Sequence, residues 1–219
     1  MLSIYEELFL LALDEEQGNI LPQVKRNLAF GLAGAILSEL ALQGKISANS
    51  KHRLDAGDAK VDGSGLLDET LQSIQSSEKP RKLAYWVGQL SVQPRKLRER
   101  IGEGLVARNL LVQEDRLFYR PPAAAESGEQ SETLPPKYKM KQALRAMILA
   151  NNKSDSRSVA LLSVIRASGL LNLVFTLDEL AAAQREIKER LVRASLADQA
   201  MLAIEEIEQA VTLTMEDAD

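Results

Sequence analysis

Four basic side chains follow one another closely after Pro94, where a helix is expected to begin. They are Arg95, Lys96, Arg98 and Arg100. Because Arg95 and Arg98 are three residues apart, they share one face of that helix. The first turn of a helix offers unpaired backbone N–H groups and the positive end of its dipole, so two guanidinium groups there would make a phosphate-binding site. The same spacing also fits a solvated charged face, and this alternative stays open.

Other groups that could carry chemistry are scarce. The chain has no cysteine, which excludes disulfides, thiolate metal sites and cysteine nucleophiles. The single histidine, His52, lies in a polar segment, where a solvated role is favoured over a ligand role. The sequence contains no glycine-rich phosphate loop, nucleophile elbow or metal-ligand spacing. It therefore predicts a non-catalytic protein without a metal or another cofactor.

Charge is distributed unevenly along the chain. The net charge is −4 and the pI is about 5.3. Residues 79–108 nevertheless carry eight basic and two acidic side chains, whereas residues 178–219 carry four basic and eleven acidic ones. A basic region on an acidic protein indicates a specific anionic partner surface rather than unspecific coating of nucleic acid. Arg81 and Lys82 are expected to belong to this supporting basic face, together with Lys96 and Arg100.

A continuous apolar stretch organises the predicted fold. Residues 28–42 are apolar on nearly every side, and a helix of this kind is either buried or spans a membrane. About fifteen residues are fewer than the ~20 that a bilayer requires, so we predict a central core helix. Gly31 and Gly34 lie three residues apart and predict the close approach of another helix or of a ligand. Gly44 is expected to end the helix.

Shorter amphipathic segments surround this stretch. Apolar spacing predicts further helices over residues 4–13, 66–76, 81–90, 95–108, 137–150, 156–171, 177–194 and 196–214. A short hairpin is expected at residues 110–119, and a loose hairpin or an irregular excursion at residues 46–65. The predicted fold class is mainly α: a single globular domain over residues 1–219, with the buried central helix in a helix bundle and one or two short β-hairpins. Residues 121–136 are expected to form a mobile surface loop and residues 215–219 a frayed acidic tail.

Two further features bear on function. Trp86, the only tryptophan, lies on an amphipathic helix, so a core or interface role is favoured over base stacking or membrane insertion. A helix followed by a hairpin occurs twice and is the outline of a winged helix, which raises a DNA-binding function. The acidic pI and the pair Glu114–Asp115 on the second hairpin argue against it. The acidic first apolar run is unlike a signal peptide, so a cytoplasmic protein is predicted.

Several segments, taken in order, resemble the Golgi phosphoprotein 3 family. They are residues 2–13 (LSIYEELFLLAL), 31–34 (GLAG), 39–46 (ELALQGKI), 66–69 (LLDE), Trp86, 97–100 (LRER) and 157–175. The resemblance covers nearly the whole chain, from residue 2 to about residue 210. It implies a mostly α-helical single domain and a peripheral membrane protein that binds phosphatidylinositol 4-phosphate at the cytoplasmic face of a membrane.

The resemblance also implies site residues. The two arginines that the family carries on the helix before its hairpin map onto Arg95 and Arg98. Two other pocket residues of the family are not retained: its arginine maps onto Ala33, and its tryptophan falls near Val24. The hairpin is expected to be short, and the basic N-terminal arm with which eukaryotic members engage vesicle coats is expected to be missing. These departures indicate a divergent member, compatible with a prokaryotic source, whose lipid specificity is altered or lost.

Three functions follow from these observations. The leading hypothesis is a non-catalytic peripheral membrane module, alone or as a homo-oligomer, that binds an anionic phospholipid headgroup through Arg95 and Arg98. The supporting basic residues would each add roughly 1 kcal/mol of attraction to an anionic membrane. The alternative is a protein-interaction adaptor that has kept the fold and lost lipid specificity, since two pocket residues are replaced and the C-terminal helix is acidic. A DNA-binding module ranks third, and an enzyme is the least favoured.

Overall fold

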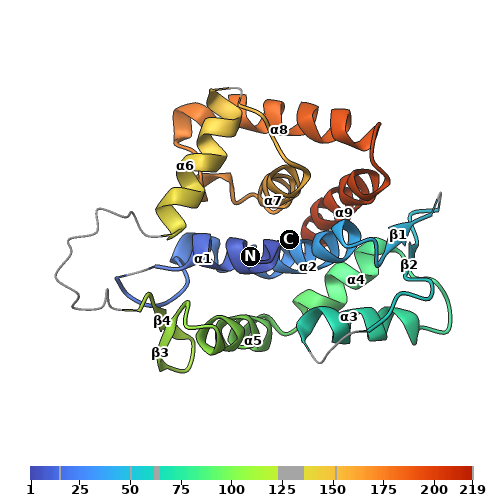
Figure 1. Cartoon of the computed structure of the whole chain (residues 1–219), viewed down its shortest axis with the longest axis horizontal. Helices are drawn as coiled ribbons and strands as arrows, with labels where there is room; N and C mark the ends of the chain where they lie inside the picture. Colours follow the sequence, from blue (N-terminus) through green and yellow to red (C-terminus); the bar gives the residue numbers. More distant parts are fainter. Residues whose placement is uncertain (15, 50, 62–64, 123–135, 151, 219) are drawn as a thin grey trace.

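The computed structural model describes residues 1–14, 16–49, 51–61, 65–122, 136–150 and 152–218, and helices dominate this part of the chain (Figure 1). The α-helices are α1 (Ile4–Ala12), α2 (Leu28–Leu42), α3 (Leu66–Gln75), α4 (Leu83–Ser91), α5 (Pro94–Ala107), α6 (Pro136–Leu149), α7 (Ser156–Ala167), α8 (Leu180–Ser195) and α9 (Gln199–Glu216). Short 3₁₀ turns are η1 (Pro22–Val24), η2 (Leu171–Leu173) and η3 (Leu177–Glu179). The predicted mainly α fold is confirmed.

Helix α2 runs through the middle of the molecule, at the bounds that its apolar stretch predicts. In Figure 1, α6, α7 and α8 lie on one side of it, while α3 and α5 lie on the other. Thirteen of its fifteen residues are buried. Because its apolar side chains point in all directions, α2 supplies core contacts to both halves of the bundle.

Two glycines let other helices approach α2 closely. A Cβ atom on Gly31 would lie 2.9 Å from Oγ of Ser168, and one on Gly34 would lie 2.7 Å from Cγ2 of Val211. Real Cβ atoms do not approach other atoms so closely, so the end of α7 and the second half of α9 pack where these side chains are missing. Gly44 adopts a φ of +67° just after α2, as expected of a residue that ends a helix. All three glycine predictions are confirmed.

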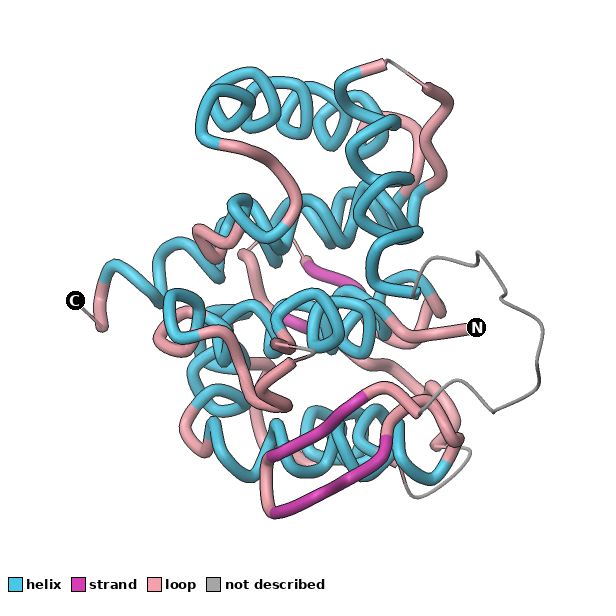
Figure 2. The backbone as a smooth tube through the Cα atoms, turned by 90° about the vertical axis from the view of Figure 1, so that its left-hand side faces the viewer, coloured by secondary structure: helices cyan, strands magenta, loops and turns pink. Residues whose placement is uncertain are grey.

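Two antiparallel hairpins complete the described fold. Strand β1 (Ser47–Ala48) pairs with β2 (Leu54–Asp55), and β3 (Val112–Asp115) pairs with β4 (Phe118–Arg120). The second hairpin has an irregular register between Gln113 and Asp115, and Leu117 has a φ of +70° in its turn. The hairpins lie toward opposite ends of the molecule in Figure 1, and Figure 2 shows the β3–β4 hairpin along the lower edge. Both predicted hairpins are confirmed.

The structure shifts several predicted boundaries. Helix α7 ends at Ala167 rather than at residue 171, since Gly169 follows with a φ of +66°. Helix α9 begins only after Asp198, whose side chain accepts a hydrogen bond from the Ala200 N–H at 2.8 Å. It continues to Glu216, so the first two residues of the expected frayed tail are helical. Most of the expected mobile loop, residues 123–135, lies outside the described residues, as does residue 219.

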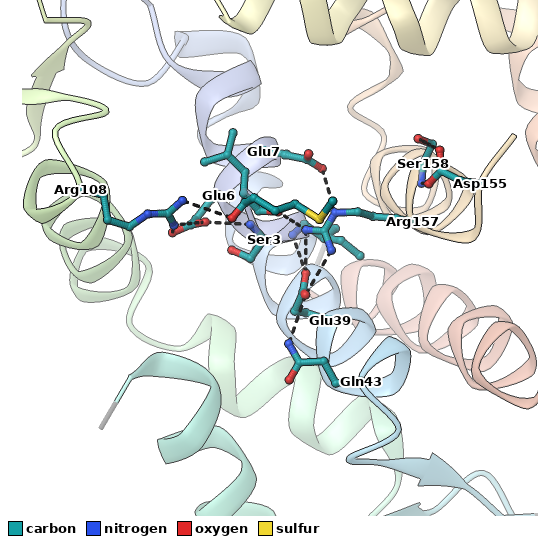
Figure 3. A network of polar contacts seen from close by, with 12 residues as sticks. Ser3, Glu6, Glu7, Glu39, Gln43, Arg108, Asp155, Arg157 and Ser158 are labelled. Carbon is teal, nitrogen blue, oxygen red and sulfur yellow. Dashed lines mark hydrogen bonds and ion pairs between the residues drawn. The ribbon is translucent and has the colours of Figure 1, made fainter. Parts of the chain in front are cut away.

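A polar network explains why the apolar helix α2 carries a carboxylate (Figure 3). The Glu39 side chain accepts a hydrogen bond from the Ile4 N–H at 2.8 Å. Arg157 from α7 donates to both carboxylate oxygens of Glu39, at 3.2 and 3.0 Å, and also to the Leu2 carbonyl. Buried charges in proteins are ordinarily paired in this way. The network thereby fixes the start of α1 against α2 and α7.

The same end of α1 is tied to α5 through Glu6. Its carboxylate accepts a hydrogen bond from the Ser3 N–H at 2.8 Å and two from Arg108, at 2.8 and 2.9 Å. Arg108 follows α5, so this pair joins the first helix to the helix that carries the predicted phosphate site.

Trp86 is 7% exposed on α4, which confirms its core role. In the described ranges, every helix is too short or too polar to cross a bilayer.

Candidate anion-binding site

Tyr119 fixes the β3–β4 hairpin against the rest of the molecule. Its N–H donates a hydrogen bond to the Gly18 carbonyl at 2.6 Å, in the turn after α1. Its ring packs edge to face on Phe9 of α1, with 5.8 Å between the ring centroids. Its hydroxyl lies 3.4 Å from the Glu99 carbonyl of α5. One buried side chain of the hairpin therefore contacts both elements that flank it.

A hollow of about 320 Å³ lies where these three elements meet. Aromatic and aliphatic side chains form much of its wall, among them Phe9, Ile20, Leu117, Phe118 and Tyr119. Four basic side chains also line it: Lys25, Arg95, Arg98 and Arg116. Among the residues that the structure describes, no acidic side chain lines this hollow. It combines an apolar wall with an excess of positive charge.

The two arginines singled out in the sequence lie together in this hollow. Arg95 is exposed, while Arg98 is half-buried and donates a hydrogen bond from Nε to the Pro94 carbonyl at 3.1 Å. Burial lowers the pKa of the Arg98 guanidinium, and the neighbouring charge of Arg95 lowers it further. Both effects disfavour the charged form, so an anion placed between the two side chains would be stabilised by them.

Two further cations that line the hollow are not predicted from the sequence. Lys25 lies between η1 and α2, next to Val24, and within the described ranges it pairs with no carboxylate. Arg116 lies in the turn between β3 and β4 and forms a two-pronged pair with Glu99 of α5. The Arg116 Nε lies 2.6 Å from Oε1 of Glu99, and Nη2 lies 3.1 Å from Oε2. No sequence spacing links either residue to α5, because only the tertiary fold brings them there.

The supporting basic residues differ in the side chains and hollows that they contact. Lys96 lines a second, shallower hollow of about 610 Å³ that shares Arg95 and Arg116 with the first. Arg100 is bound to Glu69 of α3 by hydrogen bonds of 2.7 and 2.5 Å.

The two basic residues before α4 lie apart from both hollows. The Arg81 guanidinium carbon lies 5.2 Å from the centroid of the Tyr85 ring. Lys82 lines a separate hollow with His52. The His52 side chain is 67% exposed, in agreement with a solvated residue, and its Nδ1 lies 3.4 Å from Oε2 of Glu206. Of the six basic residues singled out, Arg95, Arg98 and Lys96 therefore line the two adjoining hollows.

The two positions that the sequence predicts to depart from the family pattern lie in the core. Val24 and Ala33 are both 0% exposed and belong to the buried apolar cluster. Neither lines the hollow at α5. At this end of α2 the exposed residue that reaches the hollow is Lys25.

Sequence comparison relates the chain to known proteins. The family model described as Golgi phosphoprotein 3 matches residues 4–211. The vacuolar protein sorting-associated protein 74 of Eremothecium gossypii is 31% identical over 138 residues, which cover 54% of this chain and 41% of that protein. The protein of the same name from Schizosaccharomyces pombe is 31% identical over 137 residues, covering 53% and 40%. The aligned stretch thus spans less than half of each relative. Because the family model matches nearly the whole chain, the protein belongs to the Golgi phosphoprotein 3 family.

Proposed function

We propose that this protein is a non-catalytic peripheral membrane module that binds the phosphate of an anionic phospholipid headgroup through Arg95 and Arg98. The observation that carries the proposal is the hollow at the start of α5, in which two arginines and two further cations meet without a lining carboxylate among the described residues. The family resemblance makes phosphatidylinositol 4-phosphate the first ligand to test, at the cytoplasmic face of a membrane.

The geometry suits a phosphate group in three ways. Helix α5 begins at Pro94, so its free N–H groups and the positive end of its dipole lie beside Arg95. Guanidinium groups bind phosphate oxygens through two parallel hydrogen bonds, and Arg95 and Arg98 offer two such groups one helical turn apart. Phe118, 40% exposed, lines the same hollow and could contact the apolar edge of a bilayer.

Vesicle flotation of the full chain tests the proposal. The vesicles are phosphatidylcholine with 5% phosphatidylinositol 4-phosphate, and the protein carries Arg95→Ala together with Arg98→Ala. We expect this variant to lose most binding, because it removes both guanidinium groups from the hollow. The matched control is Arg81→Ala with Lys82→Ala, which removes the same charge elsewhere and should lower binding only modestly. Equal binding by the wild type and the Arg95/Arg98 variant would overturn the proposal.

The acidic end of the chain favours the adaptor as a second candidate. A hollow of about 390 Å³ lies along α8 and α9, and its wall includes Glu205, Glu216, Val192 and Leu213. Val192 is 39% exposed and Leu213 is 56% exposed, so acidic and apolar groups are presented together. A stoichiometric protein partner captured at a salt concentration that abolishes lipid binding, and lost on Leu213→Ser, would favour this function. Capture that is unchanged by Leu213→Ser would count against it.

A further inference from the structure

Arg116 lies at the boundary between the two hollows at α5. It lines the deeper one with Arg95 and Arg98, and the shallower one with Arg95 and Glu99. Glu99 lines only the shallower hollow. The Arg116 side chain is 75% exposed, whereas that of Glu99 is 22% exposed. The arginine is therefore the more exposed partner of this pair, on a hairpin turn, and the carboxylate is the less exposed one, on a helix.

The pair leaves part of the guanidinium unused. Nε and Nη2 of Arg116 donate hydrogen bonds to the Glu99 carboxylate, and no hydrogen bond involves Nη1 within the described residues. A guanidinium has five N–H donors, so Arg116 keeps donors available for a ligand in the deeper hollow. A phosphomonoester has about −1.5 to −2 charges at neutral pH and three acceptor oxygens, whereas a carboxylate has one charge and two oxygens. Phosphate is thus the stronger of the two partners for this side chain.

We propose that Arg116 is a further ligand-binding residue of the phosphate site and that the Glu99 carboxylate competes with the ligand for it. In the empty site Glu99 takes the place of the anion and holds the arginine at the edge of the hollow. A phosphate that enters between Arg95 and Arg98 draws Arg116 inward, away from Glu99. The inference rests on the function proposed above and adds a third arginine and an internal competitor to that site.

Competition predicts the sign of a substitution. Glu99→Gln keeps the shape of the side chain and removes its charge, so Arg116 should become free to bind the ligand. Because exposed ion pairs are weak, the variant should bind the phosphoinositide vesicles about two- to fivefold more tightly. Arg116→Ala should weaken binding, and Glu99→Gln should bring no gain once Arg116 is alanine. This dependence on Arg116 separates competition from a general change in charge.

Glu103→Gln is the matched control. Glu103 is exposed on the same helix, one turn further on, and within the described residues it forms no ion pair with Arg116. The Glu103→Gln substitution removes the same charge as Glu99→Gln. Because Glu103 does not hold Arg116, this substitution should change binding much less than Glu99→Gln. Binding is measured with the full chain and phosphatidylcholine vesicles containing 5% phosphatidylinositol 4-phosphate at a fixed salt concentration. The expected order of affinity is Glu99→Gln, then Glu103→Gln and the wild type, then Arg116→Ala.

The outcomes distinguish this inference from the proposed function. If Arg95→Ala with Arg98→Ala abolishes binding while Glu99→Gln binds no better than Glu103→Gln, the phosphate site stands and the competition is overturned. Weaker binding by Glu99→Gln would also overturn it, because Glu99 would then help to position Arg116. If the Arg95/Arg98 variant binds as the wild type does, both proposals fail.

Discussion

A Cβ atom built on Gly102 of α5 would lie 2.2 Å from Cζ of Tyr119. The aromatic ring of the hairpin thus occupies the space of the missing side chain, and the hairpin can rest on α5 only with glycine at this position. Tyr119 is 1% exposed and also contacts Phe9, so it cannot retreat without losing packing on α1. The relative position of α5 and the hairpin, and with it the shape of the anion hollow, depends on this contact.

Gly102→Ala should therefore destabilise the protein and weaken lipid binding together. Overpacking of a buried contact typically costs about 1–3 kcal/mol of unfolding free energy. Urea denaturation measures this loss, and vesicle flotation measures the binding. Gly104→Ala is the control on the same helix, because a Cβ there meets no atom of the described residues within 4 Å. It should stabilise the helix by about 0.5–1 kcal/mol. A Gly102→Ala variant as stable as Gly104→Ala would contradict the packing argument.

Lys25→Ala should weaken binding to phosphoinositide vesicles although Lys25 lies far from α5 in sequence. Removing one cation near an anionic membrane costs about 1 kcal/mol, roughly fivefold in affinity. Lys79→Ala removes an equal charge from an exposed residue that lines neither hollow at α5, and its effect should be smaller. Flotation at constant salt compares the two. Equal losses would mean that only the total charge matters.

Arg157→Met should strongly destabilise the fold, because it leaves the Glu39 carboxylate in the core without its guanidinium partner. The Glu39 side chain is 9% exposed, and loss of one partner from a buried pair costs about 3–5 kcal/mol. The control is Arg100→Met, whose partner Glu69 is 53% exposed, and which should cost no more than about 1 kcal/mol. Urea denaturation gives both values. Similar losses in the two variants would show that burial of the pair is not decisive.

Glu7 should make stability fall as pH rises toward neutrality. Burial raises the pKa of its carboxyl group to about 7, and the neighbouring Glu39 and Asp155 act in the same direction, whereas Arg157 opposes the shift. The group is protonated in the folded state and ionised in the unfolded state between its two pKa values. Its favourable contribution is therefore complete below pH ~4.5 and is lost as pH rises through 7.

Glu7→Gln removes this titration. The difference in unfolding free energy between the variant and the wild type should favour the variant more at pH 8 than at pH 5, by an amount on the order of 1 kcal/mol. Urea denaturation at both pH values measures the difference. Glu16→Gln, at an exposed position after α1, is the control for the loss of one acidic side chain. An equal effect of Glu7→Gln at both values would contradict the assigned pKa.

The sequence predicts the parts of the fold that local pattern determines. An apolar stretch without a polar face can only be a buried helix in a chain of this kind, and α2 matches it at both ends. Gly31 and Gly34 indicate close packing or a ligand, because either would offset their conformational cost in a helix, and the structure shows close packing. Arg95 and Arg98 share a face through helical geometry alone, so their common place in the hollow follows from spacing.

The remaining features depend on tertiary structure. Lys25 and Arg116 reach the hollow because the turn after α1 and the β3–β4 hairpin both fold against α5, and neither has a spacing that relates it to Arg95. The burial of Val24 and Ala33 follows from packing around α2. Arg100 looks like part of a basic face in the sequence, yet Glu69 from a distant helix binds it. Helix α9 begins later than the apolar pattern predicts, because Asp198 caps it and its first helical residue is Gln199.

The most direct test of the account compares vesicles of equal charge. The wild-type chain is floated with phosphatidylcholine vesicles that contain either phosphatidylinositol 4-phosphate or enough phosphatidylglycerol to match its negative charge, over a series of salt concentrations. If Arg95 and Arg98 form a phosphate site, binding to the phosphoinositide is stronger at every salt concentration and persists where binding to phosphatidylglycerol has vanished. Identical binding curves for the two lipids would contradict that site and reduce α5 to a charged surface.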